Sequence, residues 1–228
     1  MKQAFNTYAP IDTAEEYFKR YGIAYGRVKG TGELGVARDL NISYRDPALL
    51  PDFSDVVVLG NFSCANAKLT SLERCPKIVN GNYDCSGNFL SDLNGAPREI
   101  YGSFDASSNY CLTSLEGGPE TVAGNYDVSS CRLQTLDGAP VEIGGYFKNR
   151  DNRLISLEHA PAGCTQLYTD FGVFHGNDDI PPELLSDSAT VAPPEEDTAP
   201  PPIEDVAALT SPLPVHRPLQ LNQNRRKV

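Results

Sequence analysis

Residues 69–89 read LTSLERCPKIVNGNYDCSGNF and residues 112–132 read LTSLEGGPETVAGNYDVSSCR, so one pattern occurs twice in the chain. Related segments begin at Leu90, Leu133 and Leu154, and the starting leucines are separated by 21, 22, 21 and 21 residues. Two further columns keep the same spacing: Pro76, Pro97, Pro119, Pro140 and Pro161, and Gly60, Gly81, Gly102, Gly124 and Gly145. Three independent columns over five units establish an internal repeat.

One unit predicts one coil of a stacked structure. Tyr83 and Cys85 alternate with Asp84, which is the period of a short strand whose inward residues are an aromatic and a small apolar side chain. Asn88 follows where the chain leaves the strand, and a buried Asn side chain can satisfy backbone groups there. Leu90 then points back into the core. The Gly-Ala-Pro stretch makes the outer return, which we expect to be extended or 3₁₀ backbone because it is too short for a regular helix.

Equivalent positions of successive units share a residue type and form columns. The inward aromatic column is Phe62, Tyr83, Phe104, Tyr126 and Phe147. The next inward column is small, with Cys64, Cys85, Ala106 and Val128. The Asn column is Ala67, Asn88, Asn109, Cys131 and Asn152.

This order of residues resembles the leucine-rich repeat L-x-L-x-x-N-x-L-x-x-L, with Phe or Tyr in the first Leu position. The motif L-T-S-L-E-x-x-P followed by V-x-G-N-Y-D-C-S is similar to the short leucine-rich repeats of bacterial and bacteriophage proteins. Secreted bacterial effectors with 20- to 22-residue repeats are a second, looser resemblance. The resemblance implies a leucine-rich-repeat solenoid of parallel β coils with few or no convex helices. It also implies, by analogy, a protein-binding surface.

Both ends of the repeat array need covering, because an open coil exposes core and strand edge. Residues 1–35 predict an N-terminal helical cap, with a helix that starts at Asp12 and ends near Gly22. Its apolar surface is Tyr17, Phe18, Tyr21 and Ile23. Residues 36–175 predict the solenoid, which Leu167, Tyr168, Phe171, Val173 and Phe174 close. Residues 176–228, acidic and rich in proline, predict a disordered tail, which can be a spacer or a linear binding segment.

Composition excludes several classes of protein. Thirty acidic against 19 basic residues leave a net charge of −11, which argues against nucleic acid as a partner. The longest aliphatic run is Val56 to Leu59, too short for a membrane span, and residues 1–16 lack the apolar core of a secretory signal. We therefore expect a cytoplasmic protein, in the host cytoplasm if a phage encodes it, with a virus particle as the other location.

The candidate binding site is the strand face, by which we mean the outward side chains of the repeat strands. Asp84, Asp105 and Asp127 form its middle column, and Tyr146, Lys148 and Arg150 make its last full strand different. Stacked carboxylates can attract a basic partner or a cation, or can be a solvated polar face. Tyr146 beside Arg150 has the composition of a pair of interface anchors.

Catalytic and metal-binding residues are not evident in the sequence. The six cysteines show no C-x-x-C motif and no zinc spacing, so structural thiols are expected, although Cys64 and Cys85 on adjacent strands could form a bridge. A pair of Cys164 and His159 is the sole catalytic candidate that the sequence offers. We expect a non-catalytic protein with no cofactor and no bound metal.

The function expected is a protein–protein interaction module of phage or bacterial origin, with a protein partner bound on the strand face. The alternatives are a structural component of a virus particle and a secreted leucine-rich-repeat effector. The competing binding site is the tail.

Overall fold

The computed structural model describes residues 11–46, 50–161 and 163–185. The chain divides into two units, residues 1–191 and residues 192–228, and every described residue belongs to the first unit. The expected disordered tail therefore lies, from residue 186 onward, outside the described residues.

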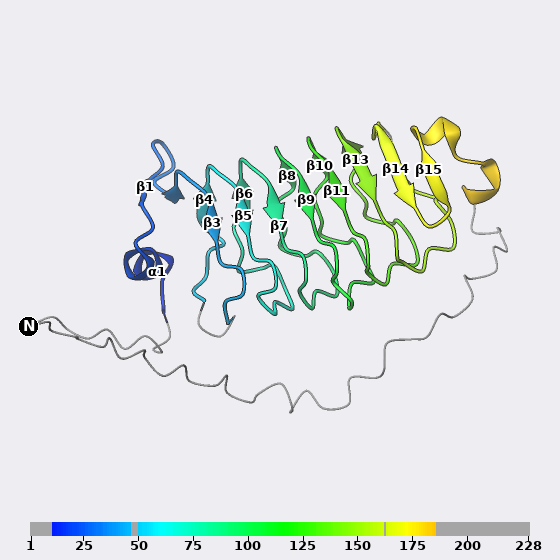
Figure 1. The fold of residues 1–228 in the computed structure, drawn as a ribbon. Helices are drawn as coiled ribbons and strands as arrows, with labels where there is room; N and C mark the ends of the chain where they lie inside the picture. Colours follow the sequence, from blue (N-terminus) through cyan, green and yellow to red (C-terminus); the bar gives the residue numbers. More distant parts are fainter. Residues whose placement is uncertain (1–10, 47–49, 162, 186–228) are drawn as a thin grey trace, which may run out of the picture. The chain divides into compact units, whose positions relative to one another are not determined.

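The main sheet confirms the parallel solenoid of about six turns (Figure 1). In this sheet the strands follow in the order β3, β5, β7, β9, β11, β13 and β14, and neighbouring strands pair in parallel. Strand β15 then returns antiparallel to β14. The strands are β3 (Leu40–Asn41), β5 (Phe62–Ser63), β7 (Tyr83–Asp84), β9 (Phe104–Asp105), β11 (Tyr126–Asp127), β13 (Tyr146–Lys148), β14 (Gln166–Thr169) and β15 (Gly172–Phe174).

In most coils another short strand precedes the strand of the main sheet. The sequence did not indicate these additional strands. These strands form two further sheets, in the orders β1-β2-β4-β6 and β12-β10-β8. They are β1 (Tyr25–Arg27), β2 (Leu34–Val36), β4 (Val56–Val58), β6 (Ile78–Val79), β8 (Glu99–Ile100), β10 (Thr121–Val122) and β12 (Glu142–Ile143). From β6 to β12 a single residue per strand is buried, so there is no alternation long enough to reveal a strand.

The glycine column allows the coils to approach closely at the corner between the two strands. A Cβ atom on Gly102 would lie 2.7 Å from the backbone nitrogen of Asn82 and from the backbone carbon of Gly81. This residue has no positive φ, so the need for glycine here is one of space and not of backbone conformation.

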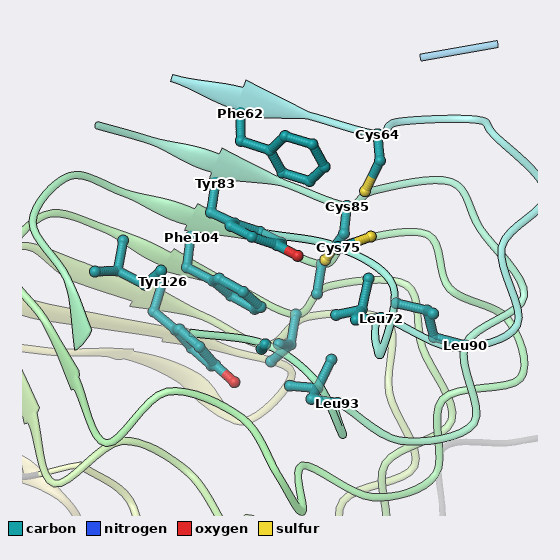
Figure 2. Close-up of a cluster of buried hydrophobic side chains, with 14 of the residues drawn as sticks. Phe62, Cys64, Leu72, Cys75, Tyr83, Cys85, Leu90, Leu93, Phe104 and Tyr126 are labelled. Atoms are coloured by element: carbon teal, nitrogen blue, oxygen red, sulfur yellow. The ribbon is translucent and has the colours of Figure 1, made fainter. Parts of the chain in front are cut away.

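The core is a ladder of stacked rings beside columns of leucine (Figure 2). Successive rings from Phe62 to Phe147 have centroids 5.0 to 5.5 Å apart. Leu90 and Leu93 are fully buried, as are Leu112, Leu115, Leu133 and Leu136 in the same two columns. Full burial of such a side chain contributes about 1.5–3 kcal/mol, so the inward columns drive the folding.

The Asn column satisfies backbone groups of the turn, as expected, and it also joins one coil to the next. The Oδ1 atom of Asn88 accepts hydrogen bonds from the backbone N–H groups of Ala67 and Leu69, both at 3.0 Å. Its Nδ2 atom donates to the carbonyls of Cys64 at 3.0 Å and Cys85 at 2.8 Å. The side chain thus bonds four backbone groups of the turn, and the Cys85 carbonyl also accepts from Asn109 Nδ2 at 3.1 Å.

The N-terminal helix α1 (Ala14–Tyr21) covers the first coil, but its cap differs from the expectation. Thr13, not Asp12, is the N-cap, and its hydroxyl accepts from the N–H of Glu16 at 3.1 Å. The helix ends at Gly22, with φ of 67°. The rings of Tyr17 and Phe18 are buried, with centroids 5.2 and 6.0 Å from that of Phe53.

Residues 176–185, which were expected to belong to the tail, have a defined structure. Two 3₁₀ turns, η2 (Asn177–Asp179) and η3 (Pro182–Leu184), follow β15. Ile180 and Leu184 are buried in the core, and the N–H of Leu157 donates to the carbonyl of Leu184 at 2.6 Å. Two apolar residues among acids and prolines are enough to anchor this segment. The tail boundary was drawn from the average composition, which does not reveal single apolar residues.

Candidate functional site

The three carboxylates of the strand face lie in one column, as expected. Asp84 is in register with Asp105, and Asp105 with Asp127. All three side chains are half-buried.

Each of these carboxylates accepts hydrogen bonds from its own turn, a structural role that was not predicted from the sequence. Asp84 Oδ1 accepts from the N–H and the hydroxyl of Ser86 at 3.1 and 2.7 Å. Asp105 Oδ1 accepts in the same way from Ser107, at 2.9 and 2.6 Å, and Asp127 Oδ1 accepts from the N–H of Ser129 at 3.0 Å. The Asp-x-Ser pattern is therefore a turn in which the carboxylate caps the backbone two residues on.

The charge of this column is distributed unevenly. Burial raises the pKa of Asp105, and the neighbouring carboxylates of Asp127 and Asp84 raise it further, against the hydrogen bonds from Ser107. Asp84 Oδ2 accepts from the hydroxyl of Ser63 at 3.0 Å, and Asp127 Oδ2 lies 3.6 Å from Lys148 Nζ. Among the described residues, Asp105 has neither a hydroxyl from the preceding coil nor an ammonium group beside its second carboxylate oxygen.

The first column of the strand face is also structural. The side-chain oxygen of each residue accepts from the backbone N–H of the equivalent residue in the next coil, at 2.8 to 3.1 Å. The acceptors are Asp39, Asn61, Asn82, Ser103 and Asn125. These side chains join each coil to the next at the corner.

The last two strands of the parallel array carry a different kind of surface, which we call the aromatic–cationic cluster: Tyr146, Lys148, Arg150 and Tyr168. Lys148 Nζ lies 4.8 Å from the centroid of the Tyr146 ring, and Arg150 Cζ lies 5.6 Å from that of Tyr168. The two rings meet edge to face, with centroids 5.8 Å apart. Such pairs are favourable at a protein surface because the ring face attracts the cation.

The structure brings together the three residues predicted for this end of the face and adds Tyr168. From the sequence, Tyr168 was expected to help close the last coil. The pairing of β13 with β14 instead places Tyr168 beside Lys148, on the outward side. Its hydroxyl donates to Gln166 Oε1 at 2.5 Å. The signal was available in the spacing, since Tyr168 follows Lys148 by 20 residues.

The thiols and histidines do not form a nucleophile–base pair among the described residues. Cys164 is buried and donates to the carbonyl of Pro161 at 3.7 Å, and burial raises the pKa of its thiol. His159 Nδ1 lies 2.6 Å from Asp137 Oδ1. The two members of the Cys164–His159 candidate thus have separate partners.

The described residues contain neither a metal-binding cluster nor a membrane-spanning helix. No group of three or more His, Cys, Asp or Glu side chains in residues 11–46, 50–161 and 163–185 is arranged to hold a metal ion. No helix in the described part of the chain has the length and apolar character needed to cross a bilayer.

Comparison with known proteins adds no relative: no family model, no curated protein and no solved structure matches this chain.

Proposed function

We propose that this chain is a non-catalytic protein-binding module, of the bacterial or bacteriophage repeat type and active in the cytoplasm, whose partner docks on the strand face at the aromatic–cationic cluster. One observation carries the proposal. Two cation–aromatic pairs lie side by side on neighbouring strands, where the other strands use their outward side chains to bond the backbone.

The composition of the cluster suits an interface. Tyr and Arg are the residues that most often dominate binding energy, because they bury large area and offer polar atoms at the same time. Parallel strands hold these side chains, so little ordering of the backbone is required on binding. Arg150 is exposed, and among the described residues it makes no ion pair with a carboxylate.

The charge along the strand face supports a partner with the opposite gradient. Asp84, Asp105 and Asp127 precede Lys148 and Arg150 in successive coils. An acidic segment would meet the cluster while a basic segment faces the carboxylates. Such complementarity orients the encounter more than it strengthens the complex.

Affinity capture with the full chain tests the proposal. The bait carries Tyr146→Ala with Arg150→Ala, and the matched control carries Tyr101→Ala, which removes a tyrosine that is 63% exposed elsewhere. We expect a protein held by the wild type and by the control to be lost by at least about tenfold from the double variant, as for two anchor residues.

Two outcomes contradict the proposal. One is equal capture by all three baits. The other is capture that survives the double substitution but is lost from a chain ending at Leu185, which would assign the binding to residues 186–228.

A further inference from the structure

The dipeptide Asn-Gly occurs twice in the chain, as Asn80–Gly81 and as Asn94–Gly95. An asparagine that precedes glycine is prone to lose its side-chain amide, because glycine lets the next backbone nitrogen approach the side-chain carbon. Both asparagines are exposed to solvent. The chain therefore presents one reactive dipeptide in two structural settings.

The backbone around Asn80 is bonded to the preceding coil. The N–H of Asn80 donates to the carbonyl of Val58 at 2.9 Å, and the N–H of Gly81 donates to the carbonyl of Gly60 at 3.0 Å. The N–H of the next residue donates to a side chain of the preceding coil, at 2.8 Å. The nitrogen of Gly81 can turn toward the Asn80 side chain only if bonds between two coils break.

Asn94 and Gly95 are the central residues of a turn on the return arc. The N–H of Ala96 closes this turn by donating to the carbonyl of Leu93 at 3.0 Å. Gly95 has a φ of 97°, the positive value typical of the third residue of a type II turn. The N–H of Asn94 donates within the turn, to Asp92 Oδ1 at 2.9 Å. The N–H of Gly95 donates to no group in the described part of the chain.

The preceding coil contacts other atoms of Gly95. Lys77 Nζ donates to the carbonyl of Gly95 at 2.7 Å. A Cβ atom on Gly95 would lie 2.4 Å from the backbone nitrogen of Glu73, so the two arcs pack closely. These contacts restrain the Cα atom and the carbonyl of Gly95, and they leave its nitrogen free to react.

The position of Asn94 is acidic in the other coils. The equivalent residues, each three positions before the arc proline, are Glu73, Glu116, Asp137 and Glu158. Asp137 precedes Gly138, whose φ is 82°, and the N–H of Ala139 closes the same turn by donating to Leu136 at 3.0 Å. An aspartate thus occupies this turn in a later coil, so the aspartate product at Asn94 is compatible with the fold.

We propose that Asn94 is a site of spontaneous deamidation in the folded protein, which converts it to aspartate or isoaspartate, whereas the fold protects Asn80. The product adds a negative charge to the acidic column of the arc. The site lies outside the aromatic–cationic cluster, so the inference does not rest on the proposed function.

The reaction needs water as its sole co-reactant. The nitrogen of Gly95 gives up its proton and attacks Cγ of Asn94, the new C–N bond closes a succinimide ring, and the amide nitrogen leaves as ammonia. Water then opens the ring at one of its two carbonyl carbons. Attack at the side-chain carbonyl gives aspartate, and attack at the backbone carbonyl gives isoaspartate. No atom changes its oxidation state.

Peptide mapping of the full chain tests the inference. The protein is incubated in mildly alkaline buffer, either folded or unfolded in guanidinium chloride, and is then digested with trypsin. Cleavage after Lys77 and Arg98 places both dipeptides on one peptide, residues 78–98, and its fragment masses report both sites at equal recovery. In the folded protein we expect Asn94 to convert at least about tenfold faster than Asn80, because local opening of the turn breaks fewer bonds. In the unfolded protein the two rates should become similar.

Two variants sharpen the result. Lys77→Ala removes the hydrogen bond to the carbonyl of Gly95, and it should accelerate conversion of Asn94 while leaving that of Asn80 unchanged. Asn94→Asp should unfold at the same denaturant concentration as the wild type, since Asp137 occupies the equivalent turn.

Three outcomes overturn the inference. The first is the same ratio of the two rates in the folded and the unfolded protein. The second is faster conversion of Asn80 than of Asn94 in the folded protein. The third is conversion of Asn94 in the unfolded protein alone, which would mean that the turn protects it as well.

Discussion

The central coils and the last coils of the solenoid have the same backbone, but they use their outward side chains differently. In the central coils Asp84 and Asp105 bond the chain two residues on, and Asn82 bonds the N–H of the next coil. In the last coils Lys148 and Arg150 lie over the rings of Tyr146 and Tyr168. A regular polar face can therefore be part of the fold, and the binding site that we propose lies where this regularity ends.

The interior shows the same contrast. The second inward column is Cys64, Cys85, Ala106 and Val128, and then Asn149, which is 0% exposed. Neither side-chain atom of Asn149 has a hydrogen-bond partner in the described structure. The hydroxyls of Tyr83 and Tyr126 in the central coils are also buried without a partner among the described residues, so the last coils differ in that a whole amide is buried in this column. Substitutions can show which region stabilises the fold.

The largest effect should come from Asn88→Ala in the central region. This change leaves two buried N–H groups and the carbonyl of Cys64 without their partner, which should lower the free energy of unfolding by about 3 kcal/mol. Urea unfolding followed by circular dichroism measures it. Asn94→Ala, at an exposed position, is the control and should change stability little. Equal effects of the two substitutions would mean that the Asn column does not join the coils.

Asn149→Val should have an effect of the opposite sign. The column already accepts Val128, and removal of an unpaired buried amide should raise the free energy of unfolding by about 1–3 kcal/mol. The reciprocal change, Val128→Asn, should lower it by a similar amount. A loss of stability in Asn149→Val would indicate that an internal water or another group satisfies this amide, and would remove the contrast between the two interiors.

The periodic columns explain how much of this fold the sequence could predict. The inward side of Tyr83, the role of Asn88 and the closure at Leu167 all follow from residue type and spacing, because each coil repeats the same burial. The strands β6, β8, β10 and β12 were missed because one buried residue per strand, such as Val79, gives no period. Thr13 was missed as the cap because Asp12 matches the same pattern one residue earlier.

The site was predicted less completely than the fold. Tyr146, Lys148 and Arg150 were found because they depart from the repeat, whereas Tyr168 lies in a segment without consensus. The capping role of Asp105 depends on the backbone turning toward its own side chain, which residue type alone does not determine.

A smaller, pH-dependent effect tests the carboxylate column. The pKa of Asp105 is raised in the folded protein, so the ionised side chain lowers the free energy of unfolding at pH values above that pKa. This loss vanishes at low pH, where the side chain is protonated in both the folded and the unfolded protein. Asp105→Asn keeps an oxygen for the N–H of Ser107 and should be more stable than the wild type at pH 7. The difference should disappear near about pH 3, below the usual pKa of Asp. Thermal unfolding at several pH values measures it, and a difference independent of pH would contradict the assignment.

The smallest effect concerns the residue before the Asn column, which has a positive φ in several coils. Gly87 occupies this position with φ of 65°, but Ser108 does so with φ of 58°. An L residue is strained in this region by about 1–2 kcal/mol, and glycine avoids the strain but adds freedom to the unfolded chain, so the two effects partly cancel. Ser108→Gly should therefore raise the free energy of unfolding by about 0.5 kcal/mol, as measured by urea unfolding.

The neighbouring serine provides the control for this substitution. Ser107 has no positive φ and donates from its hydroxyl to Asp105 Oδ1 at 2.6 Å, so Ser107→Gly should lower stability by losing that bond and adding unfolded-state freedom. Opposite signs for two adjacent serines would show that the turn has a strained position and a bonded position. If both substitutions destabilise the protein, the backbone strain at Ser108 costs less than the conformational entropy that glycine adds to the unfolded chain. The regularity of the central coils would then come from hydrogen bonds alone.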